Sequence, residues 1–416
     1  MHATDPSSHA TCRFCGAPEI RPFVDLGMSP LCESFLASDA LDRMEPFYPL
    51  DVFVCSCCFL VQLEEYVPPQ EIFGEYAYFS SYSDSWLAHA AAYSRAVIER
   101  MELGSHSFVV ELASNDGYLL RNFVSRGIPC LGIEPAANVA KAASQAGVPT
   151  LVEFFGRRCA RELVARGKLA DLIVGNNVLA QVPDLNDFVA GVALLLAPNG
   201  IVTLEFPHLL ELIERNQFDT IYHEHFSYFS LLTTERILGA HGLEVFDVEE
   251  LPTHGGSLRV FARHADAEPR VVTGAVEALR KREREARLDS LAGYEGYAQR
   301  VAETKRNLLA FLIDAKRSGR TVVGYGAPGK GNTLLNYCGI RTDFLDFTVD
   351  RNPYKLGRYL PGTHIPIFPV EKIREVRPDF VLILPWNLRN EIAEQLAYTR
   401  EWGARLVVPI PRLEVF

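Results

Sequence analysis

The sequence lacks the features of a membrane, secreted or nucleic-acid-binding protein. None of its apolar runs is long enough to span a bilayer. The first residues, MHATDPSSHATC, lack the charged and apolar segments of a signal peptide. Positive charge is also scarce, because 41 Lys and Arg stand against 52 Asp and Glu, a net charge of −11, and this argues against a basic nucleic-acid surface. We therefore expect a cytoplasmic protein with no membrane or nucleic-acid partner. We also expect a monomer, although no pattern in the sequence determines the oligomeric state.

The nine cysteines are not placed as a disulfide framework would place them. Cys12 and Cys15 form one C-x2-C pair, and Cys55 and Cys58 form another. Two such pairs are typical of a tetrahedral zinc site that holds together a segment too small for a large core. Because four thiolates leave no open coordination position, we predict a structural zinc, with Cys57 as a bystander. The isolated cysteines are expected in the core: Cys32, Cys130, Cys159 and Cys338.

A series of apolar strands with polar ends predicts a nucleotide-binding α/β fold in the middle of the chain. A strand over residues 108–112 leads into the turn ASNDG, and about twenty residues later Glu134 ends a second strand, where an acid suits ribose hydroxyls. The turn lacks G-x-G-x-x-G, so a dinucleotide fits poorly, whereas S-adenosylmethionine has a ribose and no phosphate. The residues expected to bind it are Glu111, Ala113, Asn115, Asp116, Gly117, Glu134, Pro135, Asn176 and Asn177.

The run Tyr222-His223-Glu224-His225 concentrates proton-handling side chains in four positions. Such a run has little structural use, because each polar group needs a partner when it is buried. We interpret it as a site of proton transfer, with His225 as the leading base and Glu224 orienting a neighbour. A regular strand would place alternate residues on opposite faces, so convergence requires a bend. A solvated loop and a His-x-His metal pair are the alternatives.

Two further segments carry candidate substrate residues. The aromatic stretch EIFGEYAYFSSYSDSW is either a packed linker or a substrate-facing wall, and the wall would use Tyr76, Tyr78, Ser80 and Tyr82. The segment HGGS at 254–257 is either a loop that closes over the site or a turn that leads into a strand.

A glycine-rich turn, GYGAPGKGN, follows a predicted strand near the C-terminus, after a helical stretch over 274–317. Glycines let backbone N–H groups approach an anion at a helix N-terminus, and Lys330 adds charge. The turn lacks the Walker lysine–Ser/Thr pairing, so ATP hydrolysis is not expected. It is either a vestigial nucleotide fold or, as we favour, a diphosphate clamp using Lys330 and Asn332. Asp350 ends the next strand.

Taken together, the two C-x2-C knuckles, ELASNDGYLL, GIEPA, FDTIYHEHFSYFS and GYGAPGKGNTLLN resemble the C-methyltransferases of nucleotide-linked deoxysugar biosynthesis, which act at C-3′ of 4-keto sugars. The resemblance covers nearly the whole chain. It implies an α/β protein with a zinc-binding domain (1–75), a Rossmann-like S-adenosylmethionine-binding methyltransferase domain (76–265) and a second Rossmann-like domain with a helical lead-in (266–416). It also implies a dTDP-linked 4-keto-deoxysugar substrate from an antibiotic pathway.

This implied chemistry gives the site residues their roles. A C-4′ ketone makes the C-3′ proton removable, which requires a base and donors near the developing oxyanion. His225 is the expected base, and Tyr222 and Tyr76 are expected to donate to the ketone oxygen or to position the sugar. Gln181 stands where similar methyltransferases often carry His, and its amide can position a ligand but cannot take a proton. The alternative function is a relative that binds or epimerises a keto sugar without methylating it.

Overall fold

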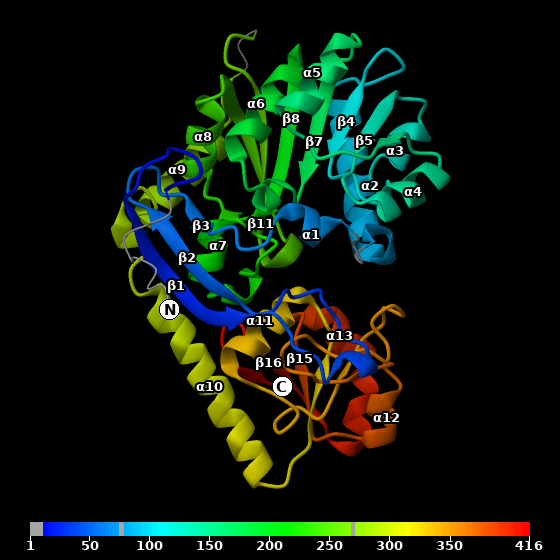
Figure 1. Ribbon diagram of the computed structural model, residues 1–416, viewed down its shortest axis with the longest axis vertical. Helices are drawn as coiled ribbons and strands as arrows, with labels where there is room; N and C mark the ends of the chain where they lie inside the picture. Colours follow the sequence, from blue (N-terminus) through cyan, green and yellow to red (C-terminus); the bar gives the residue numbers. More distant parts are fainter. Residues whose placement is uncertain (1–10, 75–78, 268–270) are drawn as a thin grey trace. The chain divides into compact units, whose positions relative to one another are not determined.

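The computed structural model describes residues 11–74, 79–267 and 271–416. Tyr76 and Tyr78 lie outside the described residues. The chain forms two compact units, each built from separate segments. Unit 1 comprises Met1–Arg21, Val54–Leu209 and Phe226–Gly293, and unit 2 comprises Pro22–Phe53, Leu210–His225 and Tyr294–Phe416. Many of the helices and strands are labelled in Figure 1.

Unit 1 contains a seven-stranded sheet with the order β10-β11-β8-β7-β4-β5-β6. Its strands are β4 (Val109–Leu112), β5 (Cys130–Ile133), β6 (Thr150–Leu151), β7 (Ala170–Asn176), β8 (Leu196–Pro207), β10 (Leu243–Leu251) and β11 (Ser257–His264). Strands β4 to β8 are parallel, and β11 is antiparallel to both β8 and β10. The strand order reverses between β4 and β7, so the carboxyl ends of these strands border a switch point where ligands bind in such sheets.

Helices cover both faces of this sheet (Figure 1). Those packed with the core of one face are α2 (Asp84–Arg100), α3 (Arg121–Val124) and α4 (Ala137–Gln145), and those of the other face are α5 (Arg157–Ala165), α6 (Leu185–Leu195) and α8 (Leu231–Gly239). In β4, Val109 belongs to the first core, and Val110 and Leu112 belong to the second. Side chains alternate between faces along a strand, so a strand buried on both faces is apolar throughout.

The remaining elements of unit 1 surround this sheet. They are β3 (Val61–Leu63), which pairs with β9 (Ser227–Tyr228) in antiparallel fashion, and the helices α1 (Pro69–Phe73) and α9 (Gly274–Glu285). Short 3-10 helices occur at η2 (Ser80–Tyr82), η3 (Leu179–Gln181) and η5 (Thr253–Gly255).

Unit 2 contains a second, six-stranded sheet with the order β14-β13-β12-β15-β16-β17. Its strands are β12 (Val322–Tyr325), β13 (Thr348–Val349), β14 (Ile367–Phe368), β15 (Phe380–Ile383), β16 (Arg405–Val408) and β17 (Glu414–Val415). All pairs are parallel except β16 with β17. The order reverses between β12 and β15, which creates a second switch point. This confirms the predicted C-terminal Rossmann-like fold.

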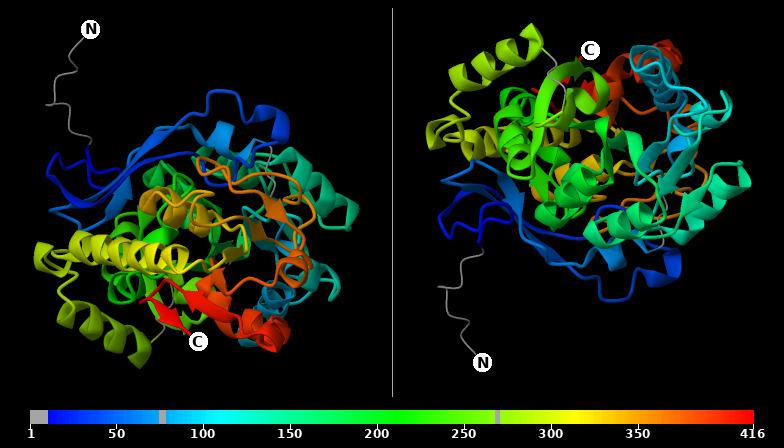
Figure 2. Two further views of the ribbon diagram at one scale, coloured as in Figure 1. Left: turned by 90° about the horizontal axis from the view of Figure 1, so that it is seen from below. Right: turned by 90° about the horizontal axis from the view of Figure 1, so that it is seen from above.

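The helices of unit 2 include one long element. They are α7 (Leu209–Glu214), α10 (Tyr297–Arg317), α11 (Gly329–Cys338), α12 (Lys372–Val376) and α13 (Arg389–Gln395), and the strands β1 (Ile20–Ser29) and β2 (Tyr48–Cys55) are neighbours in a smaller sheet. The uninterrupted length of α10 is visible in Figure 2. Within the described part of the chain, no helix combines the length and the apolar character needed to cross a membrane.

Candidate functional site

The four predicted zinc ligands come together in unit 1. The Sγ atoms of Cys12, Cys15, Cys55 and Cys58 all lie within 4.8 Å of one another. Two of the separations are 3.5 Å, from Cys12 to Cys58, and 3.6 Å, from Cys15 to Cys55. A zinc–sulfur distance of about 2.3 Å gives a tetrahedral edge of about 3.8 Å, so the donor set fits a zinc ion. Cys57 is exposed and lies outside the cluster, as predicted.

The two C-x2-C pairs form the same kind of turn, which explains why their spacing in the sequence was enough to predict the zinc ligands. The amide of Gly16 donates to the Cys12 carbonyl over 2.9 Å, and the amide of Phe59 donates to the Cys55 carbonyl over 3.0 Å. Gly16 and Phe59 each have a positive φ, 71° and 63°. The chain therefore reverses directly after the second cysteine of each pair, and both thiolates face one point. The four isolated cysteines are buried, as expected for core residues.

Three carboxyl groups converge at the carboxyl ends of β4 and β5. Glu111 is only 1% exposed, and burial, followed by the charges of Glu134 and Asp116, raises its pKa well above the usual range. Burial also raises the pKa of Glu134, although its carboxylate accepts hydrogen bonds from the amides of Asn115 and Ala136, both over 2.9 Å. A group of crowded acids is stabilised by a cation. The sulfonium and ammonium groups of S-adenosylmethionine supply such charge.

The turn after β4 has a backbone conformation that lets a ligand approach the main chain closely. Ala113, Asn115 and Gly117 all have positive φ values, 54°, 50° and 78°. A Cβ at Gly117 would lie 2.8 Å from a methyl carbon of Val148, so glycine is required here for space as well as for conformation. The helix η2 covers this turn, because the Ser80 amide donates to Asn115 Oδ1 over 2.9 Å. Ser81 makes the equivalent bond to Asp116 over 3.1 Å.

The end of β7 offers a further ligand group. Asn176 is 7% exposed, and neither its amide nitrogen nor its oxygen has a hydrogen-bond partner among the described residues. A buried amide without partners is costly, which is the expected state of a group that serves a ligand. Asn177 instead contacts His254 of η5, with 3.1 Å between Nδ2 and Nε2. The residues present therefore fit S-adenosylmethionine.

The other sequence-predicted residues of unit 1 are placed as follows. Pro135 follows Glu134 directly after β5, and Gln181 lies half-buried in η3. Ser80 is buried, whereas the Tyr82 side chain is 59% exposed. Tyr82 therefore presents its ring outward, while the backbone of the same segment binds the donor turn.

The Tyr222–His225 run belongs to unit 2 and forms the bend that convergence requires. The His225 amide donates to the Tyr222 carbonyl over 2.9 Å, and the two rings lie 4.2 Å apart. His223 is directed to another partner, the Pro49 carbonyl, 3.0 Å from its Nε2. Glu224 accepts a hydrogen bond from the thiol of Cys32 over 3.5 Å. His223, Glu224 and His225 are all buried, so the solvated-loop interpretation is wrong.

The surroundings of His225 keep its imidazole neutral. Its Nδ1 lies 3.0 Å from the Thr220 carbonyl, an acceptor, so Nδ1 carries the proton and the lone pair is on Nε2. Burial, aided by the charge of Lys330, lowers the pKa of His225 to about 4, against the opposing effect of Thr220. An imidazole in this state is unprotonated at neutral pH and can accept a proton.

A buried charge cluster lies beside His225 and joins the run to the glycine turn. Lys330 donates to Asn387 Oδ1 over 2.9 Å and lies 4.9 Å from the Trp386 ring centre. The Trp386 indole donates to Asp219 over 2.7 Å. Burial raises the pKa of Asp219 to about 6, although Lys330 and Trp386 oppose this. Burial also lowers the pKa of Lys330, which Asp219 partly offsets.

The amides of the glycine turn are partly occupied by carboxylates of the chain itself. The Ala327 amide donates to Asp350 over 2.7 Å. Burial raises the pKa of Glu33, whereas Lys355 and a hydrogen bond from the Gly329 amide lower it. Lys355 also donates to the Ala327 carbonyl over 2.8 Å. An anion at this helix start would therefore meet two acidic side chains.

Asn332, the second residue predicted for the diphosphate clamp, is buried on α11. Its Nδ2 donates to the Cys32 carbonyl over 2.6 Å. Its Oδ1 has no hydrogen-bond partner in the described part of the chain. The structure thus brings Lys330 close to the His225 environment and anchors Asn332 to the N-terminal segment of the same unit.

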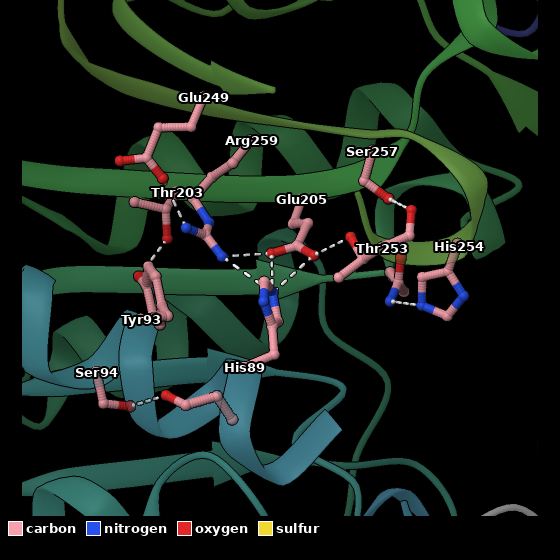
Figure 3. Close-up of polar contacts among 12 residues, drawn as sticks. His89, Tyr93, Ser94, Thr203, Glu205, Glu249, Thr253, His254, Ser257 and Arg259 are labelled. Atoms are coloured by element: carbon pink, nitrogen blue, oxygen red, sulfur yellow. Dashed lines mark hydrogen bonds and ion pairs between the residues drawn. The ribbon is translucent and has the colours of Figure 1, made fainter. Parts of the chain in front are cut away.

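Sequence reasoning missed a polar network in unit 1, drawn in Figure 3. His89 of α2, Glu205 of β8 and Arg259 of β11 meet there, and Glu205 and Arg259 are directly opposite in the strand register. The available signal was a charge inside each of two otherwise apolar strands, TLEFP and SLRVF. Buried charges are rare unless they are paired.

The fold and the donor site together define an S-adenosylmethionine-dependent methyltransferase that carries a zinc-binding domain. Residues 12–73 match the zinc binding domain family, residues 86–248 the methyltransferase domain family, and residues 252–411 the C-methyltransferase C-terminal domain family. The C-methyltransferase NovU of Streptomyces niveus is 37% identical over 404 residues, which cover 97% of this chain and 96% of NovU. The chain therefore belongs to the C-methyltransferases.

Two solved structures that resemble this chain each match less than half of it. The PH0226 protein of Pyrococcus horikoshii is 16% identical, with a TM-score of 0.37, and the match covers 49% of this chain and 99% of that protein. Magnesium protoporphyrin IX methyltransferase of Synechocystis with bound SAM is 14% identical, with a TM-score of 0.33, covering 46% and 88%. Similarities at this level carry no information about the acceptor.

Proposed function

We propose that this C-methyltransferase methylates C-3′ of a dTDP-linked 4-keto-deoxysugar in antibiotic sugar biosynthesis, with a 3-amino-2,3,6-trideoxy sugar as one candidate. The observation that carries the proposal is the state of His225, a buried imidazole with its lone pair on Nε2 and its pKa lowered to about 4. Carbon methylation needs such a base, because a C–H carbon becomes a nucleophile only after deprotonation.

In the proposed reaction, His225 Nε2 takes the C-3′ proton, and the C–H electron pair moves into the ring to leave an enolate with its charge on the C-4′ oxygen. The Tyr222 hydroxyl is the proposed donor to that oxygen, with Tyr76 as a second and Gln181 in a positioning role. The positive charge of buried Lys330, which is assigned to the diphosphate below, also favours the developing negative charge through space, without a contact to the C-4′ oxygen. S-adenosylmethionine supplies an electrophilic methyl group when it is bound.

The low pKa of His225 makes it a weak base before the substrate binds. Lys330 contributes to this by repelling a second positive charge. The diphosphate and the enolate bring negative charge, which favours the protonated imidazole and counteracts Lys330. His225 is therefore expected to become a stronger base in the complex than in the free protein.

We assign separate residues to the sugar and to the nucleotide of the substrate. Ser80, Tyr82 and Tyr78 are assigned to the sugar, and Lys330 and Asn332 to the nucleotide. Because Asp350 and Glu33 already bind amides of the glycine turn, Lys330 would have to supply most of the attraction for the diphosphate. We also propose a monomer in a reducing cytoplasm, where zinc-binding thiolates persist.

The test is an assay of S-adenosylmethionine with a small panel of dTDP-4-keto sugars. The expected product is heavier by one CH2 unit and carries the new methyl group at C-3′. In deuterated water without the donor, the wild type should exchange the C-3′ proton. His225→Gln should lower both exchange and methylation by about 10²- to 10⁴-fold, the usual contribution of a general base.

His223→Gln is the matched control, because the His223 ring binds the Pro49 carbonyl. This variant should leave the exchange rate and the methylation rate nearly unchanged. If His225→Gln exchanges and methylates at the wild-type rates, His225 is not the base. Exchange by the wild type without any methylated product would indicate an epimerase-like keto-sugar enzyme instead.

A further inference from the structure

The strand order of unit 1 gives the donor site a direction. Glu134, the proposed ribose ligand, ends β5, and the carboxyl groups of Glu111 and Asp116 lie at the end of the neighbouring β4. A donor with its ribose at β5 and its cationic end at β4 points its methyl group away from β5. The next strand ends in the sheet are those of β7 and β8. Asn176 at the end of β7 is still a donor residue, so side chains at the end of β8, one strand further from β5, are on the acceptor side of the donor.

The His89 imidazole lies at this end of β8. Its Nε2 is 3.0 Å from each carboxylate oxygen of Glu205, as Figure 3 shows. Nε2 also lies 3.2 Å from Arg259 Nη2, which cannot accept a hydrogen bond. Because Arg259 Nη2 already donates to Glu205 over 2.6 Å and the two carboxylate contacts of Nε2 are the shorter ones, we assign the proton of the neutral ring to Nε2, so that Nδ1 keeps its lone pair. The His89 side chain is 18% exposed, and Nδ1 makes no hydrogen bond to any of the described residues. The ring is therefore oriented, and one nitrogen is available to a ligand.

Glu205 has a positively charged partner besides the histidine. Arg259 donates to the Glu205 carboxylate over 2.6 Å, and the Thr253 hydroxyl donates to it over 3.1 Å. Burial opposes ionisation of Glu205, but the hydrogen bond from His89 and the charge of Arg259 lower its pKa below the usual value. The carboxylate is thus already paired, and its contact with His89 fixes the imidazole.

Aromatic contacts connect His89 to the donor turn. Its ring stacks on Trp86 with centres 5.0 Å apart, and Trp86 stacks on Tyr118, which directly follows Gly117, at 6.0 Å. Trp86 also contacts His254, which binds Asn177 at the end of β7. The oriented imidazole is therefore packed against residues that border the donor site.

We propose that His89 is an acceptor-binding residue: its Nδ1 accepts a hydrogen bond from a hydroxyl or amino group of the sugar, while Glu205 and Arg259 hold the ring in place. This inference rests on the proposed function, because it assigns the acceptor a contact on the methyl-donor unit. It adds a specificity contact, since a sugar without a hydrogen-bond donor at that position loses the interaction.

His89→Phe tests the proposal, because phenylalanine keeps a ring that can stack on Trp86 but has no acceptor lone pair, and Glu205 keeps its hydrogen bonds from Arg259 and Thr253. We expect the acceptor KM to rise about 3- to 10-fold, the effect of one lost hydrogen bond, with kcat within twofold. Loss of an interaction that is equal in the ground and transition states raises KM alone. The Kd of S-adenosylmethionine, measured by calorimetry without the acceptor, should stay within twofold.

Tyr93→Phe is the control for a merely structural role of this region. Tyr93 lies on the same helix, and its hydroxyl binds Thr203 over 2.6 Å, so the variant should lower the Tm and leave the acceptor KM unchanged. An unchanged acceptor KM in His89→Phe overturns the proposal, as does an equal loss of donor affinity. If His89→Phe does not fold, His89→Leu is measured in its place. Failure of the wild type to methylate any keto sugar overturns the proposed function and this inference with it.

Discussion

The buried polar groups near the site differ in whether the protein itself satisfies them. His225 has its Nδ1 proton bound by Thr220, and Asp219 accepts from Trp386. Asn176, by contrast, has a buried amide without a partner among the described residues. Groups of the first kind are held in one protonation state by their surroundings. A group of the second kind contributes to binding without contributing to folding.

This difference predicts the behaviour of Asn176→Ala. The amide has no hydrogen-bond partner among the described residues, so its removal breaks no bond, and relief of the cost of burying it offsets the packing that is lost. The free energy of unfolding should therefore stay within about 1 kcal/mol of the wild type. The Kd of S-adenosylmethionine should rise about 3- to 10-fold, measured by calorimetry. Asn216→Ala is the contrast, because Asn216 binds Thr304 in unit 2 over 2.7 Å. It should lower stability and leave the donor Kd unchanged, and the reverse pattern would contradict the assignment.

His225 predicts a pH dependence of stability. Its pKa is about 4 in the folded protein and about 6.5 in an unfolded chain, so between these values the unfolded chain binds a proton that the folded protein does not. The folded state therefore loses stability as pH falls from about 6.5 to 4, by about 3 kcal/mol in all. In urea unfolding at pH 7 and pH 4.5, His225→Gln should lose less stability than the wild type.

Asp219 has the opposite dependence, because its raised pKa of about 6 makes the folded protein bind a proton first as pH falls. Asp219 is present in both the wild type and His225→Gln. Its effect therefore largely cancels when the pH dependence of stability of one protein is subtracted from that of the other. Equal pH dependences in the wild type and His225→Gln would show that His225 titrates normally in the folded state.

At the scale of elements, the sequence predicted what local patterns determine. The cysteine spacing, the strand ending in Leu112 and the glycine turn before α11 each depend on residues close together in the chain. The partners of these elements could not be predicted in this way. Glu205 and His89 are 116 residues apart, and Cys32 and Asn332 are 300 residues apart. Such pairs depend on strand register and long-range packing, which no single segment encodes.

The contact between α8 and α9 is another long-range element contact and predicts a stability effect. Glu283 of α9 is fully buried. Its carboxylate accepts hydrogen bonds from the amides of Leu231 and Leu232 at the start of α8, over 2.6 and 2.9 Å. The same carboxylate lies 2.7 Å from His208 Nε2. A carboxylate at a helix N-terminus is favourable. Glu283→Gln should lower the free energy of unfolding by about 1–3 kcal/mol, since one acceptor oxygen becomes a donor.

Glu277→Gln on the same helix is the matched control, because Glu277 is exposed and its ion pair is an i,i+3 contact with Arg280. Its effect should stay within about 0.5 kcal/mol in urea unfolding. If both variants unfold at the same urea concentration as the wild type, the buried carboxylate does not stabilise the start of α8.

At the scale of the whole molecule, each unit is assembled from distant parts of the chain. Residues 210–225, which include the proposed base, belong to the same unit as the C-terminal sheet, whereas the donor site belongs to unit 1. Patterns along the sequence could not reveal this, because membership of a unit is decided by contacts between distant segments. Similarly, the segment Pro22–Phe53 belongs to unit 2, yet cysteines on both sides of it build one zinc site in unit 1.

The zinc site therefore closes a long loop, and this gives a prediction for the metal. Cys15 and Cys55 are forty residues apart in sequence, and cross-linking a loop of that length reduces the entropy of the unfolded chain by about 4 kcal/mol at 25 °C. Cys15→Ser should abolish stoichiometric zinc binding, measured by elemental analysis, and lower the free energy of unfolding by about that amount or more. Cys57→Ser, outside the cluster, should keep one zinc per chain and wild-type stability; metal retained by Cys15→Ser and lost by Cys57→Ser would reverse the ligand assignment.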